Sequence, residues 1–259
     1  MDEYHQICPE VPIWVGGPEV SYETEAFLKE HPQVTGVMTG EGEETFLELC
    51  ESYAKAGIGE MAEKMNFSGI KGIMYRAGES LVKTGAREPL DLNRIPFCYG
   101  GVEDFRNRII YYESSRGCPF RCSYCLSSVE KTLRFRDVER VKKELAFFLE
   151  QEVAQVKFVD RTFNCRHEHA MEIWKFLIEH DNGVTNFHFE ISADLLTDEE
   201  IALIGQMRPG LIQLEIGVQS TNGATIKEIH RTMQLERLKE VVREVQKHEN
   251  IHEHLDLIA

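Results

Sequence analysis

"RIIYYESSRGCPFRCSYC" occupies residues 108–125 and joins a strand-like run to three closely spaced cysteines. The opening residues, 108–115, carry the β-branched and aromatic side chains that favour an extended strand. Cys118, Cys122 and Cys125 follow almost at once. In parallel α/β folds the reactive groups collect where the strands end. The stretch therefore predicts the first strand of such a fold, with a functional loop at its carboxyl end.

Beyond this loop the hydrophobic pattern alternates between helical and strand periods. Thr197, followed three residues later by Glu200, forms the capping-box pattern that starts a helix. Repeated strand-helix units predict a parallel sheet, either doubly wound or bent toward a barrel. Because the last predicted strand has no closing helix, we expect a piece of a longer protein. The predicted helices are 137–151, 167–180, one from Thr197 and one through 235–245; the strands are 155–160, 186–192, 211–218 and 252–259.

The residues before 108 have a different organisation. A short strand runs into Gly16 and Gly17, and a second strand is followed by the Gly-Glu-Gly-Glu sequence at 40–43. These features predict the later part of a small α/β unit over residues 1–60. Residues 61–107 are expected to form a hairpin and a linker rich in proline and glycine, and 108–259 the main domain.

Composition and charge exclude several function classes. The 259 residues are 42% apolar and carry a net charge of -15, which argues against non-specific binding to nucleic acid or an anionic membrane. The sequence begins with no secretory signal pattern and contains no apolar run of about 18 residues, so we expect a cytoplasmic protein without a membrane span. Its seven cysteines, an odd number, do not predict a disulfide framework. The scattered Cys8, Cys50, Cys98 and Cys165 are expected to be small buried residues.

The three clustered cysteines point to metal-ligand chemistry, because thiolates are soft ligands. No other Cys or His follows within the next thirty residues. An iron-sulfur cluster held by three thiolates would keep one iron open for a substrate or cofactor. A zinc site completed by Cys165 or His167, or three unligated thiols, are the alternatives that spacing alone leaves open.

The spacing Cys118-x-x-x-Cys122-x-x-Cys125, with Tyr124 before the last cysteine, resembles the signature of the radical SAM superfamily. The resemblance implies that the thiolates hold a 4Fe-4S cluster whose fourth iron is chelated by S-adenosylmethionine (SAM). One electron from a donor such as flavodoxin or ferredoxin then cleaves SAM to methionine and a 5'-deoxyadenosyl radical. It also implies a (β/α)6 barrel of parallel strands, here lacking its last unit, and places Tyr124 beside the adenine.

Three later segments resemble the family's second, third and fourth strand regions: "FVDRTFN" (158–164), "HFEISADLLTDEE" (188–200) and "EIGVQS" (215–220). The fourth region is similar to that of coproporphyrinogen-dehydrogenase-like members and methylthiotransferases. Each implied contact has an ordinary alternative, such as a helix N-cap for Asp160, an exposed strand residue for Glu190 and a solvated helix-end residue for Arg231. The SAM contacts that the resemblance implies, besides Tyr124, are Asp160, Glu190, Gln219 and Arg231.

The front of the chain resembles the last part of the Rossmann-like cobalamin-binding domain that precedes many radical SAM domains. The segments are "PIWVGGPEVSYE" (12–23) and "VTGVMTGEGEETFLEL" (34–49). The resemblance places Gly16 and Gly17 near the nucleotide tail of the corrin, where glycine permits a close backbone approach. The Asp-x-His-x-x-Gly motif of some cobalamin domains does not occur in residues 1–10.

Together these features predict a radical SAM enzyme, with cobalamin-dependent methyl transfer to an unactivated carbon as the favoured reaction. A methylthiotransferase-like or coproporphyrinogen-dehydrogenase-like enzyme without cobalamin is the second interpretation. A zinc-stabilised interaction module is the alternative that is not an enzyme. The sequence does not indicate the substrate.

Overall fold

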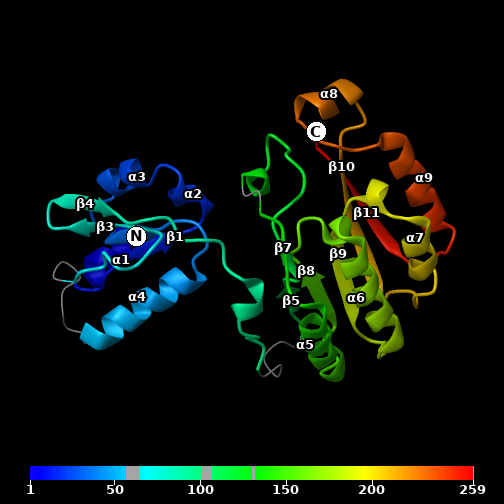
Figure 1. The fold of residues 1–259 in the computed structure, drawn as a ribbon, viewed down its shortest axis with the longest axis horizontal. Coiled ribbons are helices and arrows are strands. Elements are labelled where there is room, and N and C mark those ends of the chain that lie inside the picture. The colour runs from blue at the N-terminus through cyan, green and yellow to red at the C-terminus, as the bar shows by residue number, and fades with distance from the viewer. Residues whose placement is uncertain (57–64, 101–106, 130–131, 259) are drawn as a thin grey trace. The chain divides into compact units, whose positions relative to one another are not determined.

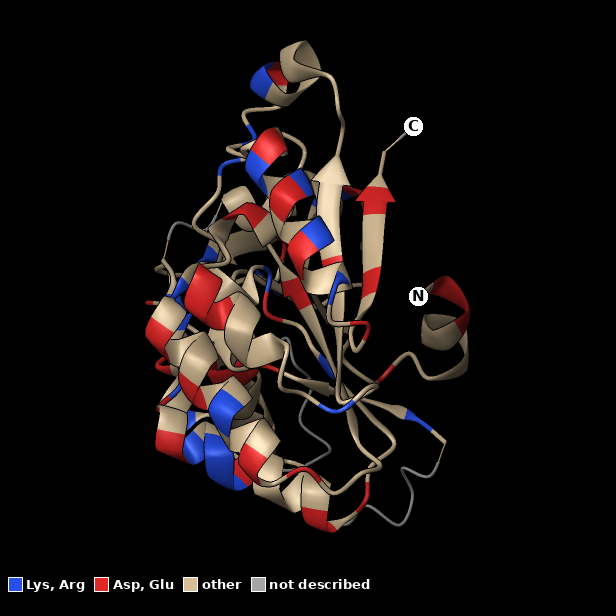
Figure 2. Cartoon of the chain, turned by 90° about the vertical axis from the view of Figure 1, so that its right-hand side faces the viewer, with Lys and Arg blue, Asp and Glu red and all other residues tan. Residues whose placement is uncertain are grey.

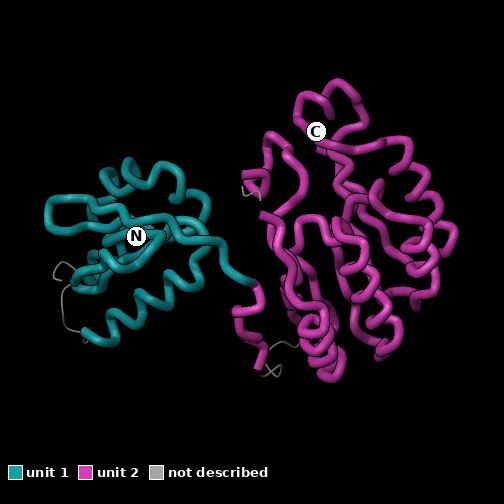
Figure 3. The backbone as a smooth tube through the Cα atoms, viewed as in Figure 1, with its two compact units in different colours: residues 1–91 teal, residues 92–259 magenta. Residues whose placement is uncertain are grey.

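The structure is a computed structural model that describes residues 1–56, 65–100, 107–129 and 132–258. The chain forms two compact units, Met1–Asp91 and Leu92–Ala259, which are coloured separately in Figure 3. Of the predicted hairpin and linker region, residues 61–64 and 101–106 lie outside the described ranges, as does the end of the last predicted strand. The boundary between the units falls inside that predicted region.

The first unit contains a four-stranded sheet in the order β1-β2-β3-β4. β1 and β2 are parallel and are joined through α2 and α3, whereas β3 and β4 form an antiparallel hairpin beside β2. The predicted hairpin therefore belongs to the first sheet. The elements are α1 (Asp2–Ile7), β1 (Trp14–Gly16), α2 (Pro18–Ser21), α3 (Thr24–Glu30), β2 (Gly36–Met38), α4 (Glu43–Ala56), β3 (Ile73–Ala77) and β4 (Ser80–Lys83).

The second unit is built on five parallel strands in the order β11-β10-β9-β8-β5 (Figure 1), which confirms the predicted parallel α/β fold. A two-stranded antiparallel clasp, β6 with β7, follows β5. The strands are β5 (Ile109–Tyr112), β6 (Ser115–Arg116), β7 (Arg134–Phe135), β8 (Gln155–Phe158), β9 (Asn186–Ile191), β10 (Ile212–Gln219) and β11 (His252–Leu257). The helices are α5 (Val138–Glu150), α6 (His167–Glu179), α7 (Asp198–Ile204), α8 (Gly223–Glu228) and α9 (Leu235–Gln246), with short 3-10 turns at Leu92–Arg94, Leu126–Ser128, Phe163–Cys165 and Ala193–Leu195.

Strict alternation along the strands gives this sheet one apolar and one polar face. In β9, Phe187, Phe189 and Ile191 are buried, while the residues between them point to the opposite face. The helices α5, α6, α7 and α9 pack their buried apolar residues on the apolar face. Figure 2 shows the Lys, Arg, Asp and Glu positions spread along the helices. The predicted capping box is present at the start of α7, where Thr197 accepts from the Glu200 backbone and Glu200 accepts in return. The polar face is therefore free to carry chemistry.

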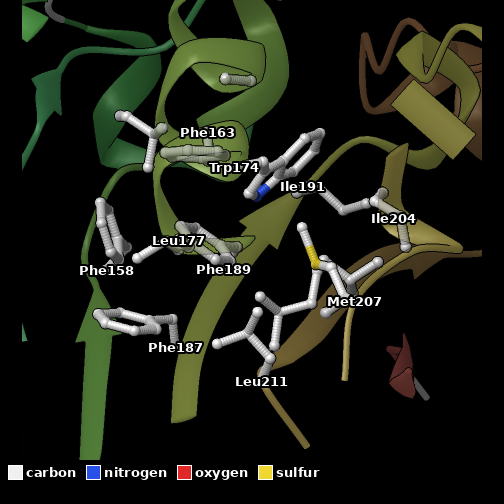
Figure 4. Close-up of a cluster of buried hydrophobic side chains, with 14 of the residues drawn as sticks. Phe158, Phe163, Trp174, Leu177, Phe187, Phe189, Ile191, Ile204, Met207 and Leu211 are labelled. Atoms are coloured by element: carbon white, nitrogen blue, oxygen red, sulfur yellow. The ribbon is translucent and has the colours of Figure 1, made fainter. Parts of the chain in front are cut away.

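The core between sheet and helices is aromatic. Trp174 of α6 is fully buried against Phe163 and Phe189, with ring centroids 5.5 and 6.1 Å away (Figure 4). Large buried rings contribute much apolar area. This packing fixes β8 and β9, whose carboxyl ends carry part of the site described below.

The scattered cysteines do not all follow the prediction. Cys50 and Cys98 are exposed, and Cys8 and Cys165 are half-buried. For Cys50 the reason is its position on the solvent side of the amphipathic helix α4, whose buried residues are Thr45 and Leu49. No helix in the described parts of the chain is long and apolar enough to cross a membrane.

Candidate functional site

The cysteine loop is closed at its base by the clasp of β6 and β7. Ser115 pairs with Phe135, so the chain leaves and returns at neighbouring points. Gly117 has φ +99°, and a Cβ at this position would lie 2.5 Å from the carbonyl oxygen of Thr132. Such a contact excludes side chains, so glycine is required where the loop begins. The clasp fixes the start of the loop just before Cys118.

Seven of the predicted site residues line a single pocket of about 200 Å³. They come from four different elements and loops, separated by more than a hundred residues of sequence. The structure thus brings together the predicted cluster ligands and most of the predicted SAM contacts. They are Cys118, Cys122, Cys125, Tyr124, Glu190, Gln219 and Arg231.

The strand residues reach this pocket because they lie on the polar face of the sheet. Glu190 of β9 and Glu215 of β10 are paired in the parallel register. Gly217 and Gln219 follow at two-residue intervals on β10, so they share the same face. Gln219 has φ +67° at a register shift with β11, and a Cβ on Gly217 would lie 2.5 Å from the Gln219 side-chain nitrogen. Glycine at 217 leaves room for the glutamine to fold back toward the pocket.

Arg231 connects the fourth strand to the cysteine loop. Its guanidinium donates to the carbonyl of Gly217, and Nη1 lies 3.9 Å from the sulfur of Cys122. The backbone N–H of Ser123 donates to the carbonyl of Ile229 at 2.9 Å, which ties the loop to the end of α8. Arg231 is therefore placed to offer donors to an anionic group in the pocket.

An ionic cluster extends from the pocket along the polar face. Lys157 Nζ lies 3.0 Å from Glu215 and 3.8 Å from Glu190, and His188 Nε2 lies 2.9 Å from Glu215. Burial raises the pKa of Glu190, with the Glu215 charge adding to the effect. Burial also acts to raise the pKa of Glu215, but Lys157 and His188 outweigh it and hold this pKa below its usual value. The pKa values of these two pocket carboxylates are thus shifted in opposite directions.

Asp160, the remaining predicted SAM contact, is not among the residues that line the pocket. Its carboxylate is fully buried and accepts hydrogen bonds from the Ser114 backbone N–H (2.9 Å), the Ser114 hydroxyl (2.7 Å) and the Ser115 hydroxyl (2.5 Å). Burial raises the pKa of Asp160 to about 6. In this structure both oxygens of Asp160 accept from the serines that precede the cysteine loop, and its contact with SAM stays a prediction.

Several pocket residues were not singled out from the sequence. Glu215 and Gly217 could have been found, because they precede Gln219 at two-residue steps in a strand. Arg161 and Thr162 follow the second strand, and Asp256 lies on the last one, where sequence carries no comparable signal. Each of these five residues lines the pocket.

The two residues expected to complete a zinc site do not lie at this pocket. Neither Cys165 nor His167 lines it. Burial raises the pKa of the Cys165 thiol to about 11, with Asp160 and Cys118 adding to the effect, so this residue resists becoming a thiolate ligand. His167 instead lies 3.2 Å from Glu200. Three thiols at one pocket, with neither Cys165 nor His167 beside them, fit a cluster that keeps one iron open.

The thiols of Cys118, Cys122 and Cys125 are not grouped as a metal site in this structure. Among the described residues, no three His, Cys, Asp or Glu side chains are grouped closely enough to hold a metal ion. Metal sites commonly form only as the metal binds, because binding and local folding are coupled. We therefore expect the loop from Cys118 to Cys125 to tighten when a cluster is assembled.

In the first unit, Gly16 ends β1 and Gly17 has φ +102°. Gly40, with φ +76°, follows the neighbouring parallel strand β2. A Cβ on Gly17 or Gly40 would meet nothing within 4 Å, so both turns present open backbone. A cavity of about 790 Å³ in this unit is lined by Thr39 but by none of these glycines. The open turns fit close approach of a ligand to the backbone.

Comparison with known proteins identifies the class that this fold and site define. The model of the radical SAM superfamily matches residues 112–257, and the chain belongs to that superfamily. Membership confirms the resemblance seen in the sequence, and it makes SAM and a 4Fe-4S cluster the cofactors of this chain.

Two curated relatives and one solved structure illustrate the similarity. An uncharacterized methyltransferase of Pyrococcus horikoshii is 30% identical over 62% of this chain and 36% of its own length. The anaerobic magnesium-protoporphyrin IX monomethyl ester cyclase of Rubrivivax gelatinosus is 25% identical over 92% of this chain and 44% of its own length. The radical S-adenosylmethionine methyltransferase TsrM of Kitasatospora setae, solved with cobalamin and a [4Fe-4S] cluster, superposes with a TM-score of 0.76 at 15% identity, over 99% of this chain and 54% of TsrM. The chain thus spans less than half the length of the two curated relatives.

Proposed function

We propose that the chain forms the cofactor-binding part of a radical SAM methyltransferase that uses cobalamin and acts on an unactivated carbon. The observation that carries the proposal is the single pocket shared by Cys118, Cys122, Cys125 and the polar residues of β9 and β10. Three cysteine thiols with no fourth cysteine or histidine at the pocket suit a cluster with an open iron. When bound, the cluster and SAM supply a 5'-deoxyadenosyl radical by one-electron cleavage.

The protein's own groups would bind and orient SAM. Glu190 and Gln219 offer hydrogen-bond acceptors from the polar face of the sheet, and Arg231 offers bidentate donors to a carboxylate. Tyr124, half exposed at the rim, offers a flat ring to the adenine. The helices on the opposite face keep water from that side, and an excluded solvent protects a reactive radical.

Cobalamin binding is supported by the open turns at Gly17 and Gly40 and by the TsrM structure, which holds cobalamin. The first-unit turns follow parallel strands, where α/β domains bind their ligands. A second reaction, ring closure, is favoured by the match to the cyclase of Rubrivivax gelatinosus across both units. In either case we propose that a substrate binds beside the cofactors and that the electron comes from a donor of the flavodoxin or ferredoxin class. We also propose a cytoplasmic location.

The first test is anaerobic reconstitution followed by iron and sulfide analysis. The proposal expects about four iron and four acid-labile sulfide per chain, and 5'-deoxyadenosine when SAM and a reductant are added. A Cys50→Ala variant, which removes an exposed thiol outside the pocket, is the matched control for Cys118→Ala and should keep the cluster. One bound zinc with no 5'-deoxyadenosine would contradict the enzyme and support the zinc-stabilised module.

The reaction type is tested with the full-length protein and SAM labelled in its methyl group. A methyltransferase transfers the labelled methyl group to its product, whereas the product of a cyclase-like enzyme contains no label. Retention of a corrin absorption spectrum after gel filtration would support cobalamin. Protein that forms 5'-deoxyadenosine but retains no corrin would favour the methylthiotransferase-like or coproporphyrinogen-dehydrogenase-like alternative.

A further inference from the structure

A buried carboxylate, Asp160, is bonded to the two serines that lead into the cysteine loop. Asp160, at the carboxyl end of β8, is fully buried and forms no ion pair with any residue in the described parts of the chain. A buried charge without a partner is costly, and it is retained where surrounding hydrogen bonds offset the cost. Here three such bonds come from Ser114 and Ser115. Asp160 therefore uses its hydrogen bonds to fix a second segment of the chain, and among the described residues it does not neutralise a cationic side chain.

The segment that Asp160 holds is the entry to the cysteine loop. Ser114 and Ser115 are themselves buried, at 0% and 2% exposure, and Ser115 lies three residues before Cys118. His169 Nε2 lies 3.1 Å from the Ser114 hydroxyl. Because this hydroxyl donates to Asp160, the histidine is the donor in that contact. His169 of α6, Ser114 and Asp160 at the end of β8 are thus joined by a continuous series of buried hydrogen bonds.

The same strand end also touches a cluster cysteine directly. The hydroxyl of Thr162 lies 3.5 Å from the sulfur of Cys118 and 2.8 Å from the carbonyl of Arg161. Thr162 is 5% exposed and lines the pocket. The Thr162 hydroxyl has a single hydrogen, which it donates to the Arg161 carbonyl in this structure. A thiolate has no proton to give, so when Cys118 is a ligand thiolate this hydrogen would have to turn from the carbonyl to the sulfur.

We propose that Asp160 and Thr162 position Cys118 for the cluster: Asp160 fixes the serines that lead into the loop, and Thr162 donates to the Cys118 sulfur. The inference rests on the proposed function, since it takes Cys118 as a ligand. Both are positioning residues that act through Cys118. Hydrogen bonds to ligand sulfurs and to groups behind the ligands set the affinity and reduction potential of such sites.

Substitutions of Thr162 and Asp160 are expected to change different properties of the cluster, its midpoint potential and its rate of iron release. Thr162→Val keeps the shape but removes the hydroxyl, so it should shift the midpoint potential of the cluster to more negative values, because the thiolate charge is less stabilised. Thr162→Ser should restore the potential of the parent. Asp160→Asn replaces one carboxylate oxygen with an NH2 group that cannot accept from Ser114 and Ser115. The Asp160→Asn variant should release iron to a chelator about ten- to a hundredfold faster, the usual size of the effect when a residue that supports a metal ligand is replaced.

The experiment uses the anaerobically reconstituted chain, a redox titration followed by electron paramagnetic resonance, and timed iron release. Asn250→Ala is the matched control, because Asn250 is a buried residue that bonds the Ile204 and Met207 carbonyls, outside the pocket. It should leave both the potential and the release rate unchanged.

Variants of Asp160 and Thr162 that match the parent in potential and release rate would overturn the positioning role alone. If Thr162→Ser behaved as Thr162→Val does, the hydroxyl would be excluded as the cause and the proposal would also fail. A parent chain that assembles no cluster would refute the proposed function, and the positioning role with it. Thr162→Val keeps the test decisive even if Asp160→Asn does not fold, since circular dichroism reports folding separately.

Discussion

Gly117→Ala tests whether the clasp at the base of the cysteine loop controls the site. Gly117 has φ +99°, a conformation that costs a residue with a side chain about 1 to 3 kcal/mol. The added Cβ would also lie 2.5 Å from the Thr132 oxygen and 3.1 Å from its carbonyl carbon, so the backbone must shift. We therefore expect the loop entry to move and cluster retention to fall.

The matched control is Gly223→Ala in α8 of the same unit. Gly223 has no positive φ and an added Cβ meets nothing within 4 Å. Alanine at such a compatible site stabilises by about 0.4 to 1 kcal/mol. The two variants should therefore differ by about 1.5 to 4 kcal/mol in the free energy of unfolding, measured by urea denaturation. Equal stabilities, together with equal iron content after reconstitution, would refute the reasoning about the clasp.

Three further predictions concern the core, the series of buried hydrogen bonds and the pocket. Trp174→Ala empties a fully buried site and should cost about 3 to 5 kcal/mol of unfolding free energy in urea titration; a loss below 1 kcal/mol would mean that this core is not packed as described. Burial lowers the pKa of His169 to about 4, below its usual 6.5. Folding thus favours the neutral imidazole, and the stability that this adds is lost as pH falls from about 6.5 toward 4. His169→Gln should flatten the dependence of unfolding free energy on pH in that window. An unchanged dependence would count against the lowered pKa of His169. Arg231→Lys removes the bidentate fork, so the SAM dissociation constant should rise about tenfold or more in equilibrium dialysis; an unchanged constant would remove Arg231 from the SAM site.

Much of the fold was predictable because residues close together in the sequence determine where its strands and helices lie. The alternation Phe187, Phe189, Ile191 marks a strand with one buried face, and Thr197 with Glu200 marks the start of a helix. The cysteine spacing was equally local. The parallel order of the strands then followed from the repeated strand-helix units.

The parts that were not predictable depend on partners distant in the sequence. Asp160 follows its strand as a ligand-contacting residue would, but its carboxylate bonds to Ser114, just before β6, and to Ser115, the first residue of β6. The ion pair between Lys157 and Glu215 likewise depends on which strands lie near each other in the sheet. No local pattern contains this information.

The central claim is that three thiols hold a cluster whose fourth iron is open to SAM in the pocket beside Glu190, Gln219 and Arg231. The most direct measurement is the electron paramagnetic resonance spectrum of the reduced, reconstituted protein before and after SAM is added. The account predicts a 4Fe-4S signal that changes on SAM addition in the parent, and no such cluster in Cys122→Ala. A cluster signal that SAM leaves unaltered, at SAM concentrations that saturate binding, would contradict it.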